Sequence, residues 1–216
     1  MIPAMIVPIL RRPELLYRML DSIDYPVKTL IIIDNGRALN TSRGWPVEHV
    51  QSTQVITMPA NLGVAGSWNL GIKSAPFAPW WLVVNFDAVF EPGSLKRFRE
   101  EADQGSLLLS GGQPPWCAFA IGDQVVERVG LFDEGFHPAY CEDTDYAWRC
   151  EMSGVPVVTS TIPVQHTNSS TLSAGFAEMN ARSFPANVEY LQGKVAAGDC
   201  GEGRWLPSRR RALSWD

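Results

Sequence analysis

The fold is most readily predicted from Trp80-Trp-Leu-Val-Val-Asn-Phe-Asp-Ala-Val-Phe-Glu-Pro92, an apolar run that ends on Asn85 and Asp87 before a Pro-Gly break. A short run of apolar and β-branched residues predicts a strand buried on both faces of a sheet. Polar side chains at its carboxyl end would lie in the crevice where open α/β sheets bind ligands. Asn85 and Asp87 project to the same side of an extended chain, where an aspartate can hold a divalent cation against a diphosphate. A strand that ends in a simple Asx-turn is the alternative.

Composition is typical of a globular protein. A hydrophobic content of 45% and eight tryptophans exclude a disordered or fibrous chain. A length of 216 residues suits one domain with a full core. The net charge of −5 argues against general affinity for nucleic acid or anionic membrane. Arg204 and Arg209–Arg211 form a basic tail that could contact phosphates or simply be solvated.

Cysteine spacing and the N-terminal sequence predict where the protein works. No C-x-x-C pair occurs, so reduced thiols are expected at Cys117, Cys141, Cys150 and Cys200. The N-terminus has no basic region ahead of an uninterrupted apolar stretch, so no signal peptide is expected. No apolar run approaches the roughly 20 residues that span a bilayer. We therefore expect a soluble, cytoplasmic protein without a transmembrane segment.

Strands and helices alternate through the first 105 residues, which predicts a doubly wound, Rossmann-like α/β fold with a mostly parallel sheet flanked by helices. We expect strands at 4–10, 29–33, 54–58 and 80–84, with one helix from Pro13 and another into which residues 61–66 lead and which ends near Ser74. The less regular second half predicts strands at 107–110, 118–121 and 155–160 and helices at about 93–103 and 143–153. Residues 176–195 predict a helix broken by Pro185, followed by a Gly-rich linker at 198–203.

Three polar clusters follow successive predicted strands, namely Asp34-Asn35-Gly36, Asn61-Leu62-Gly63 and Asn85-Phe86-Asp87. Because the carboxyl ends of parallel strands lie along one edge, we expect the clusters to converge where one nucleotide could contact all three. Asp34 can accept hydrogen bonds from a ribose hydroxyl or a base N–H, and Asn61 can donate and accept. Taken singly, each residue is also explained as a turn residue or helix cap. The glycines form neither a Walker loop nor a complete G-x-G-x-x-G motif.

Carboxylates crowd the start of the predicted helix at 143–153, where Glu142, Asp143 and Asp145 occur together. The helix dipole favours anions there, which is a purely structural explanation. A carboxylate at a helix N-terminus beside a crevice is also what a general base needs in order to deprotonate a hydroxyl. His166, which follows the strand at 155–160, could complete the ligand set of a metal or be a solvated loop residue.

The order of these motifs resembles that of the inverting, GT-A-type family 2 glycosyltransferases, in the branch with rhamnosyl- and galactofuranosyltransferase-like enzymes. The resemblance covers about residues 3–195. Its motifs are Val7-Pro8 with Arg12-Pro13-Glu14-Leu15-Leu16, Ile33-Asp34-Asn35-Gly36, Asn61-Leu62-Gly63-Val64-Ala65-Gly66 with Asn69 and Gly71, Asn85-Phe86-Asp87, Gly130-Leu131-Phe132-Asp133-Glu134, Glu142-Asp143-Thr144-Asp145-Tyr146-Ala147-Trp148-Arg149, and His166 with Ser169-Ser170-Thr171.

The resemblance implies a role for each matching position. The nucleotide sugar would be bound by Pro8, Asp34, Asn61, Gly63, Asn85 and Asp87. Asp87, the last Asp of the D-x-D motif, and His166 would bind Mn²⁺ or Mg²⁺, and Asp143 would be the catalytic base with Glu142 beside it. The chain departs from the family in two places: Asn85 replaces the first Asp of D-x-D, and Lys194-Val-Ala-Ala-Gly198 stands where relatives often carry Lys-aromatic-Gly-Gly.

The resemblance also implies an architecture and a reaction. A single GT-A domain would span 1–197, with a nucleotide-binding half at about 1–105, an acceptor-binding half at about 106–197, and a linker and basic tail at 198–216. The enzyme would move a sugar from a UDP- or dTDP-linked donor to a hydroxyl of a glycan, lipid carrier, protein or modified nucleobase, with metal dependence and inversion, and could form a homodimer. A nucleotide-sugar-binding protein with little turnover is one alternative, favoured by Asn85. A nucleotidyltransferase is another, although the Gly-rich phosphate loop is missing.

Overall fold

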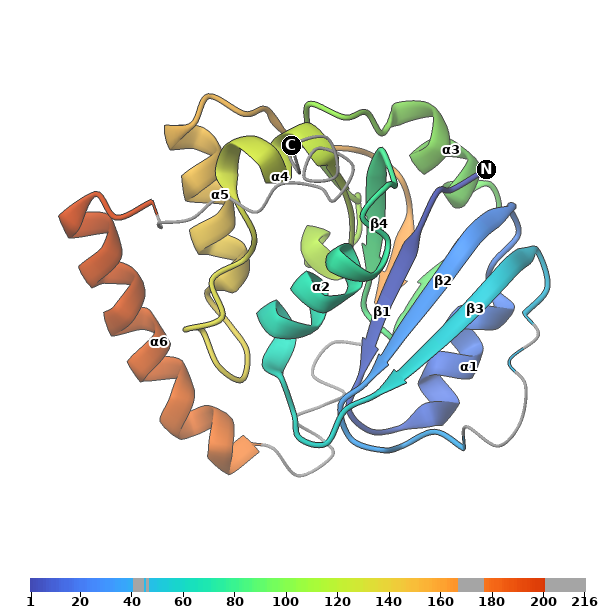
Figure 1. Cartoon of the computed structure of the whole chain (residues 1–216), viewed down its shortest axis with the longest axis horizontal. Helices are drawn as coiled ribbons and strands as arrows, with labels where there is room; N and C mark the ends of the chain where they lie inside the picture. Colours follow the sequence, from blue (N-terminus) through green and yellow to red (C-terminus); the bar gives the residue numbers. More distant parts are fainter. Residues whose placement is uncertain (41–44, 46, 167–176, 201–216) are drawn as a thin grey trace, which may run out of the picture.

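The structure is a computed structural model that describes residues 1–40, 45, 47–166 and 177–200. Its centre is a seven-stranded sheet with the order β3-β2-β1-β4-β7-β6-β8 (Figure 1). The strands are β1 Met5–Ile9, β2 Val27–Asp34, β3 Val50–Thr57, β4 Trp80–Val84, β6 Leu107–Leu109, β7 Ala118–Gly122 and β8 Val157–Thr159. A two-stranded sheet pairs β5 Ala88–Phe90 with β9 Val164–His166.

The strand order creates a switch point beside β1. Strands β1, β2 and β3 are parallel neighbours on one side, and β4 pairs parallel to β1 on its other side. The crevice at such a point, outside the carboxyl ends of the strands, is where doubly wound folds bind ligands. Only β7 runs antiparallel within the seven described strands of this sheet, since β8 is parallel to β6. The predicted mostly parallel α/β sheet is confirmed.

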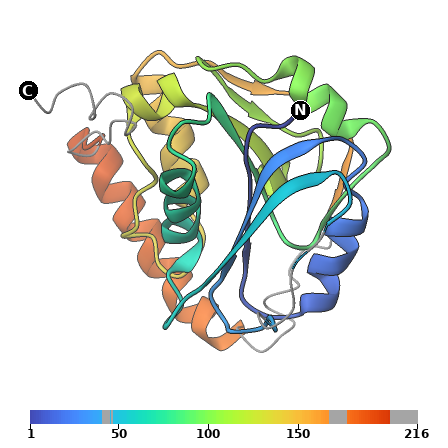
Figure 2. The same cartoon turned by 45° about the vertical axis from the view of Figure 1, so that its right-hand side comes forward.

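Helices cover both faces of the sheet (Figures 1 and 2). They are α1 Pro13–Asp21, α2 Gly63–Ser74, α3 Ser94–Glu101, α4 Asp123–Val129, α5 Glu142–Met152 and α6 Ala177–Ala197, with a 3₁₀ turn at Pro115–Cys117. Because side chains alternate along a strand, neighbouring residues of β1 enter different cores. Val7 belongs to the core that also contains Leu16 of α1 and Phe98 of α3. Ile6 belongs to the other, which contains residues of α2, α4 and α5.

The structure corrects the prediction for the C-terminal helix. Helix α6 continues through Pro185 instead of breaking there. Proline removes one backbone donor, but side chains beyond it, including Asn187 and Lys194, are buried against the rest of the protein and hold the second part of the helix in place. The sequence also missed α4 and the three-residue strands β5 and β9, which are too short for a periodic pattern. Most of the predicted linker and the basic tail lie outside the described residues.

Two other expectations concern solubility and redox state. Of the helices described, none combines the length and the apolar character needed to cross a membrane. Cys117, Cys141 and Cys150 are free, buried thiols, and Cys200 is a free, partly exposed one. The cytoplasmic location stays a prediction.

Candidate functional site

The carboxylate of Asp34, at the end of β2, orders the loop that follows. It is fully buried, and one of its oxygens accepts hydrogen bonds from the amides of Gly36 and Ala38, at 3.3 and 2.9 Å. The other oxygen accepts a bond of 3.1 Å from the amide of Leu39. Asp34 therefore acts on this edge of the sheet through the shape of the loop, and its direct contact with a ribose or base stays a prediction.

Asn35 and Asn61 join the second and third strands to helix α2. The side chain of Asn35 donates to the Ser67 hydroxyl at 2.7 Å and accepts from the Leu62 amide at 3.1 Å. The side-chain oxygen of Asn61 accepts from the Gly63 amide at 2.9 Å and so forms an Asx-turn that leads into α2. The clusters at 34–36 and 61–63 thus meet, as predicted from the sheet edge, and leave α2 with its N-terminus at that edge.

Gly63 is required by a close approach of another part of the chain. Its φ is +73°, and a β-carbon there would lie 2.8 Å from the Pro138 carbonyl oxygen. That oxygen accepts a hydrogen bond of 2.8 Å from the Val64 amide, and an imidazole nitrogen of His137 lies 3.3 Å from the Asn61 carbonyl oxygen. The segment that leads to the acidic helix α5 therefore packs directly on the start of α2.

The end of β4 brings together the residues predicted to bind metal. Strand β5 pairs antiparallel with β9, with Ala88 opposite His166, so the histidine reaches the turn after β4. His166 Nε2 lies 3.0 Å from Asp87 Oδ1 and 3.3 Å from the Asn85 amide nitrogen. The Asp87 and His166 side chains are only 5% and 8% exposed. The structure thus places Asp87, Asn85 and His166 around one point.

The donor atoms at this point fit a divalent cation. Both contacts use the same nitrogen, Nε2 of His166. If it accepts a hydrogen bond from the Asn85 amide it cannot also donate one to Asp87, so the two contacts compete. A carboxylate, an imidazole and an amide oxygen, which rotation of the Asn85 amide would supply, are all metal ligands. Among the described residues, no group of three or more His, Cys, Asp and Glu side chains is arranged to hold a metal. A cation here would therefore need further ligands from outside these side chains.

The acidic cluster begins helix α5 after a strained turn. Tyr140 and Cys141 have φ values of 75° and 74°, which are unusual for residues with a side chain and cost about 1–3 kcal/mol each. We call residues 139–141 the α5 turn. It leads directly into Glu142 and Asp143, so its conformation decides where these two carboxyl groups stand.

Glu142 and Asp143 differ in their surroundings. Glu142 is only 6% exposed, and one carboxyl oxygen is buried without a hydrogen-bond partner. Burial, with the neighbouring Asp143 carboxylate second, raises the pKa of Glu142 to about 8, so this side chain holds its proton at neutral pH. Asp143 is half-buried and accepts hydrogen bonds of 2.7 and 3.2 Å from the amide and hydroxyl of Thr144. Of the two, Asp143 is the one suited to accept a proton.

Asp145, the third carboxylate, has a structural role that the sequence did not reveal. It is fully buried and pairs with Arg149 and with Lys194, both at 2.7 Å. Lys194 also contacts Asp133 at 2.5 Å. Burial lowers the pKa of Lys194, but hydrogen bonds to Asp133 and Asp145 outweigh it and the net shift is upward. The sequence did show a lysine in the motif at 194–198, but it gave no indication that this lysine pairs with Asp133 and Asp145.

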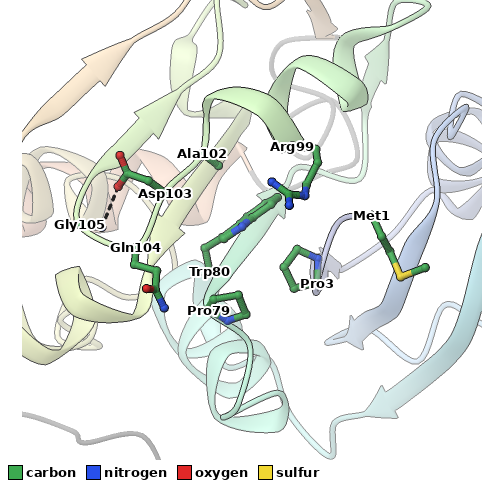
Figure 3. A pocket seen from close by; sticks show the side chains of 9 residues that line it. All are labelled: Met1, Pro3, Pro79, Trp80, Arg99, Ala102, Asp103, Gln104 and Gly105. Carbon is green, nitrogen blue, oxygen red and sulfur yellow. Dashed lines mark hydrogen bonds between the residues drawn. The ribbon is translucent and has the colours of Figure 1, made fainter.

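A pocket of about 390 Å³ lies at the other end of β4, where Pro79, Trp80 and Arg99 line it (Figure 3). Pro79 and Trp80 lie at the start of the strand and Arg99 belongs to α3, whereas Asn85 and Asp87 follow the carboxyl end of the strand. Another lining residue, Asp103, accepts a hydrogen bond of 2.7 Å from the Gly105 amide. This pocket is thus separate from the predicted site.

The switch point and the polar groups at its carboxyl edge define the Rossmann-like, doubly wound class of α/β proteins. A family model described as Glycosyl transferase family 2 matches residues 4–123, more than half of the chain. The chain therefore belongs to this family and carries its glycosyltransferase domain.

A galactofuranosyl glycosyltransferase of Leishmania donovani is 21% identical, with the match covering 88% of this chain and 62% of that protein. This chain therefore spans less than two thirds of that relative's length.

Solved structures with the same fold come from several glycosyltransferases. Mannosyltransferase PcManGT from Pyrobaculum calidifontis, solved with GDP-Man and Mn²⁺, is 13% identical with a TM-score of 0.60, covering 98% of this chain and 78% of that one. TarS of S. aureus is 15% identical with a TM-score of 0.59, covering 78% and 37%. GalNAc-T7, solved with UDP, GalNAc and Mn²⁺, is 10% identical with a TM-score of 0.59, covering 76% and 44%. The predicted GT-A fold is confirmed.

Proposed function

We propose that this protein transfers a sugar from a nucleoside diphosphate sugar to an acceptor hydroxyl, with inversion at the anomeric carbon and with the help of a divalent cation. The observation that carries the proposal is the convergence of Asp87, His166 and Asn85 at the carboxyl end of β4. Family membership supports the reaction type. The Mn²⁺ in the PcManGT and GalNAc-T7 structures supports the cation.

The nucleotide would lie along the edge formed by the ends of β1, β2 and β3. Pro8 lies near the end of β1, and Asp34, opposite Ile9, ends β2. Asn61 and Gly63 lie at the N-terminus of α2, whose helix dipole favours anions such as phosphates. The amides of Gly63 and Val64 already bind Asn61 and Pro138, so the attraction would come from the dipole and not from these two donors. We propose a UDP- or dTDP-linked donor. The UDP in structures of TarS and GalNAc-T7 supports the first of these.

Asp87 and His166 would hold the cation, with the Asn85 amide as a further ligand. A cation bound there neutralises charge on the departing diphosphate. The requirement that this chain places on the donor is that its phosphate oxygens complete the ligand set, because Asn85 contributes no negative charge.

Asp143 would act as the general base. It takes the proton of the acceptor hydroxyl as that oxygen forms a bond to the anomeric carbon, and the bond from this carbon to the diphosphate breaks from the opposite face. Glu142 holds its own proton at neutral pH and so cannot accept another. The acceptor hydroxyl could belong to a glycan, a lipid carrier, a protein or a modified nucleobase.

Asn85 favours a second candidate function, which is binding of a nucleotide sugar with little turnover. A site with one carboxylate fewer binds a hard cation less tightly.

Two measurements separate these functions. Thermal unfolding with UDP, dTDP and GDP, each with and without Mn²⁺ or Mg²⁺, identifies the nucleotide because a ligand of the folded state raises the melting temperature. Hydrolysis of the corresponding nucleotide sugars, with and without EDTA, then tests turnover. We expect cation-dependent hydrolysis. Binding without hydrolysis would support the second candidate, and stabilisation by none of the nucleotides would contradict both.

A further inference from the structure

One face of α6 packs against the segment that leads into α5. Phe184, Asn187, Tyr190 and Lys194 are spaced by three or four residues and therefore lie on one side of the helix. Phe184 meets Tyr140 edge-to-face, with ring centroids 5.6 Å apart. The Tyr190 hydroxyl donates to Asp133 at 3.0 Å, and Lys194 contacts the same carboxylate. The C-terminal helix thus supports this segment at both ends.

Asn187 occupies the centre of that face and binds the α5 turn itself. It is 5% exposed, and its amide nitrogen donates to the carbonyl oxygens of Ala139 and Tyr140 at 2.8 and 3.1 Å. Both partners are acceptors, so only the amino end of the amide can face them. The two hydrogen bonds therefore fix the side-chain orientation as well as the position of the turn.

The strain in the α5 turn gives these bonds their importance. Left-handed conformations at Tyr140 and Cys141 are strained and persist only where the surroundings impose them. The two hydrogen bonds from Asn187 stabilise the turn and so offset part of that strain. Without Asn187, the turn would lose the contacts that offset its strain.

We propose that Asn187 is a positioning residue: by binding the Ala139 and Tyr140 carbonyls it holds the α5 turn in the left-handed form that places Glu142 and Asp143. The catalytic part of this statement rests on the proposed function, since it takes Asp143 as the base. The placement itself does not, because it concerns only contacts within the chain. The buried position of Glu142, with its unpartnered carboxyl oxygen, is the structural consequence of that placement.

The titration of Glu142 reports on the turn without any substrate. Carbon-13 NMR of glutamate-labelled protein, with the signal assigned by Glu142→Gln, gives its pKa in wild type and in Asn187→Ala. The titratable groups that interact with Glu142 are Asp143, Tyr140 and Cys141, and all three remain in this variant. We expect the pKa of Glu142 to fall by more than about one unit towards the ordinary value of about 4.3, because a relaxed turn lets water reach it.

Two further variants make the titration decisive. Gln192→Ala, on the exposed side of the same helix, should leave the pKa of Glu142 unchanged. Asn187→Ser, whose hydroxyl is too short to bridge both carbonyls, tests the same point if the alanine variant does not fold. A Glu142 pKa equal to that of wild type in a folded Asn187 variant overturns the proposal.

A double-mutant cycle with Cys141→Gly tests the role of strain. Glycine adopts positive φ at no steric cost, so the change that Asn187→Ala causes in the Glu142 titration should shrink in the Cys141→Gly background. Fully additive effects would mean that Asn187 does not act through the turn.

Activity separates this proposal from the proposed function. Once a donor is found, we expect Asn187→Ala to lower transfer about 10–100-fold with donor affinity unchanged, because a small displacement of a base is costly. If wild type shows no transfer or hydrolysis with any nucleotide sugar, the proposed function fails. The titration of Glu142 still tests whether Asn187 positions the α5 turn. If wild type is active and Asn187→Ala matches it, the catalytic part is wrong.

Discussion

The two halves of the candidate site are held in place by different means. At the strand ends, Asp34 binds amides two to five residues further along, and Asn61 binds an amide two residues away. The α5 turn is held by Asn187 and the preceding Asp133 by Lys194, and these two residues lie 47 to 61 residues further along the chain than their partners. The first half is therefore shaped partly by local contacts, although Asn35 also binds Ser67 and Leu62, and His166 reaches Asp87 from a distant part of the chain. The second half depends on the correct docking of α6, so substitutions in that helix should affect the acidic cluster and leave the strand ends intact.

The largest effect is expected from Asp143→Asn, which should break the second half alone. An amide keeps the shape of the side chain but cannot accept the proton, so transfer should fall by about 10²–10⁴-fold with donor Kd nearly unchanged. The kcat and the donor Kd of both proteins check this. Transfer close to the wild-type rate would remove Asp143 from the mechanism.

Lys194→Met should destabilise the protein because it weakens the docking of α6 on the rest of the chain. It leaves Asp133 and the buried Asp145 without their shared cation, although Asp145 keeps Arg149, so we expect the free energy of unfolding to fall by about 3 kcal/mol. Urea denaturation measures this. The matched control is Arg182→Met, which breaks an exposed ion pair with Glu178 on the same helix and should cost less than about 1 kcal/mol. Equal losses in the two variants would contradict the importance of the buried network.

Asp87→Ala and His166→Ala should break the first half alone. Both should weaken cation-dependent binding of a nucleoside diphosphate about 10–100-fold and leave binding of the bare nucleoside nearly unchanged. Calorimetry with the nucleoside diphosphate and with the bare nucleoside, each with and without Mn²⁺, separates the cation-dependent part of binding from the rest. A variant that keeps the full enhancement by Mn²⁺ has lost no metal ligand.

The pH dependence of stability should sharpen the comparison, because Glu142 has a pKa of about 8 in the folded protein. Its pKa in the unfolded chain is about 4.3, so the folded state binds an extra proton between these values. The resulting stabilisation is fully present below about pH 4.3 and is lost as the pH rises through about 8, at no more than about 1.4 kcal/mol per pH unit. Urea denaturation at pH values from about 5 to about 8 gives the free energy of unfolding across this window. The decrease of that free energy with pH should be shallower for Glu142→Gln than for wild type. Glu189→Gln, at an exposed position of α6, should keep the wild-type slope.

The smallest effect is expected from Asn85→Asp. A second anionic ligand should tighten Mn²⁺ binding by up to about tenfold at saturating nucleoside diphosphate. Turnover need not rise, since a tightly held product can slow release. A weaker or unchanged Mn²⁺ Kd would show that Asn85 does not stand where the first Asp of D-x-D stands.

The linear sequence was enough to predict the sheet and the residues at its edge. A short, uninterrupted apolar run such as 80–84 indicates a strand buried on both faces, and a polar residue directly after such a run lies at the carboxyl edge, whatever packs around it. Asp34, Asn61, Asn85 and Asp87 were therefore predictable, as were Glu142 and Asp143 at a helix start. His166 was expected as a ligand, but the strand pairing that brings it to Asp87 was not, because β5 and β9 lie far apart in the chain and no local pattern encodes their pairing.

Packing between distant parts of the chain determines which of these groups keeps a proton and which side chains hold them in place. Glu142 and Asp143 are adjacent in sequence, yet burial separates their chemistry, since desolvation depends on what packs around each carboxyl group. The helix predicted to break at Pro185 stays intact because Asn187 and Lys194 are buried against distant partners. Such contacts join residues far apart in the chain, and no local pattern encodes them.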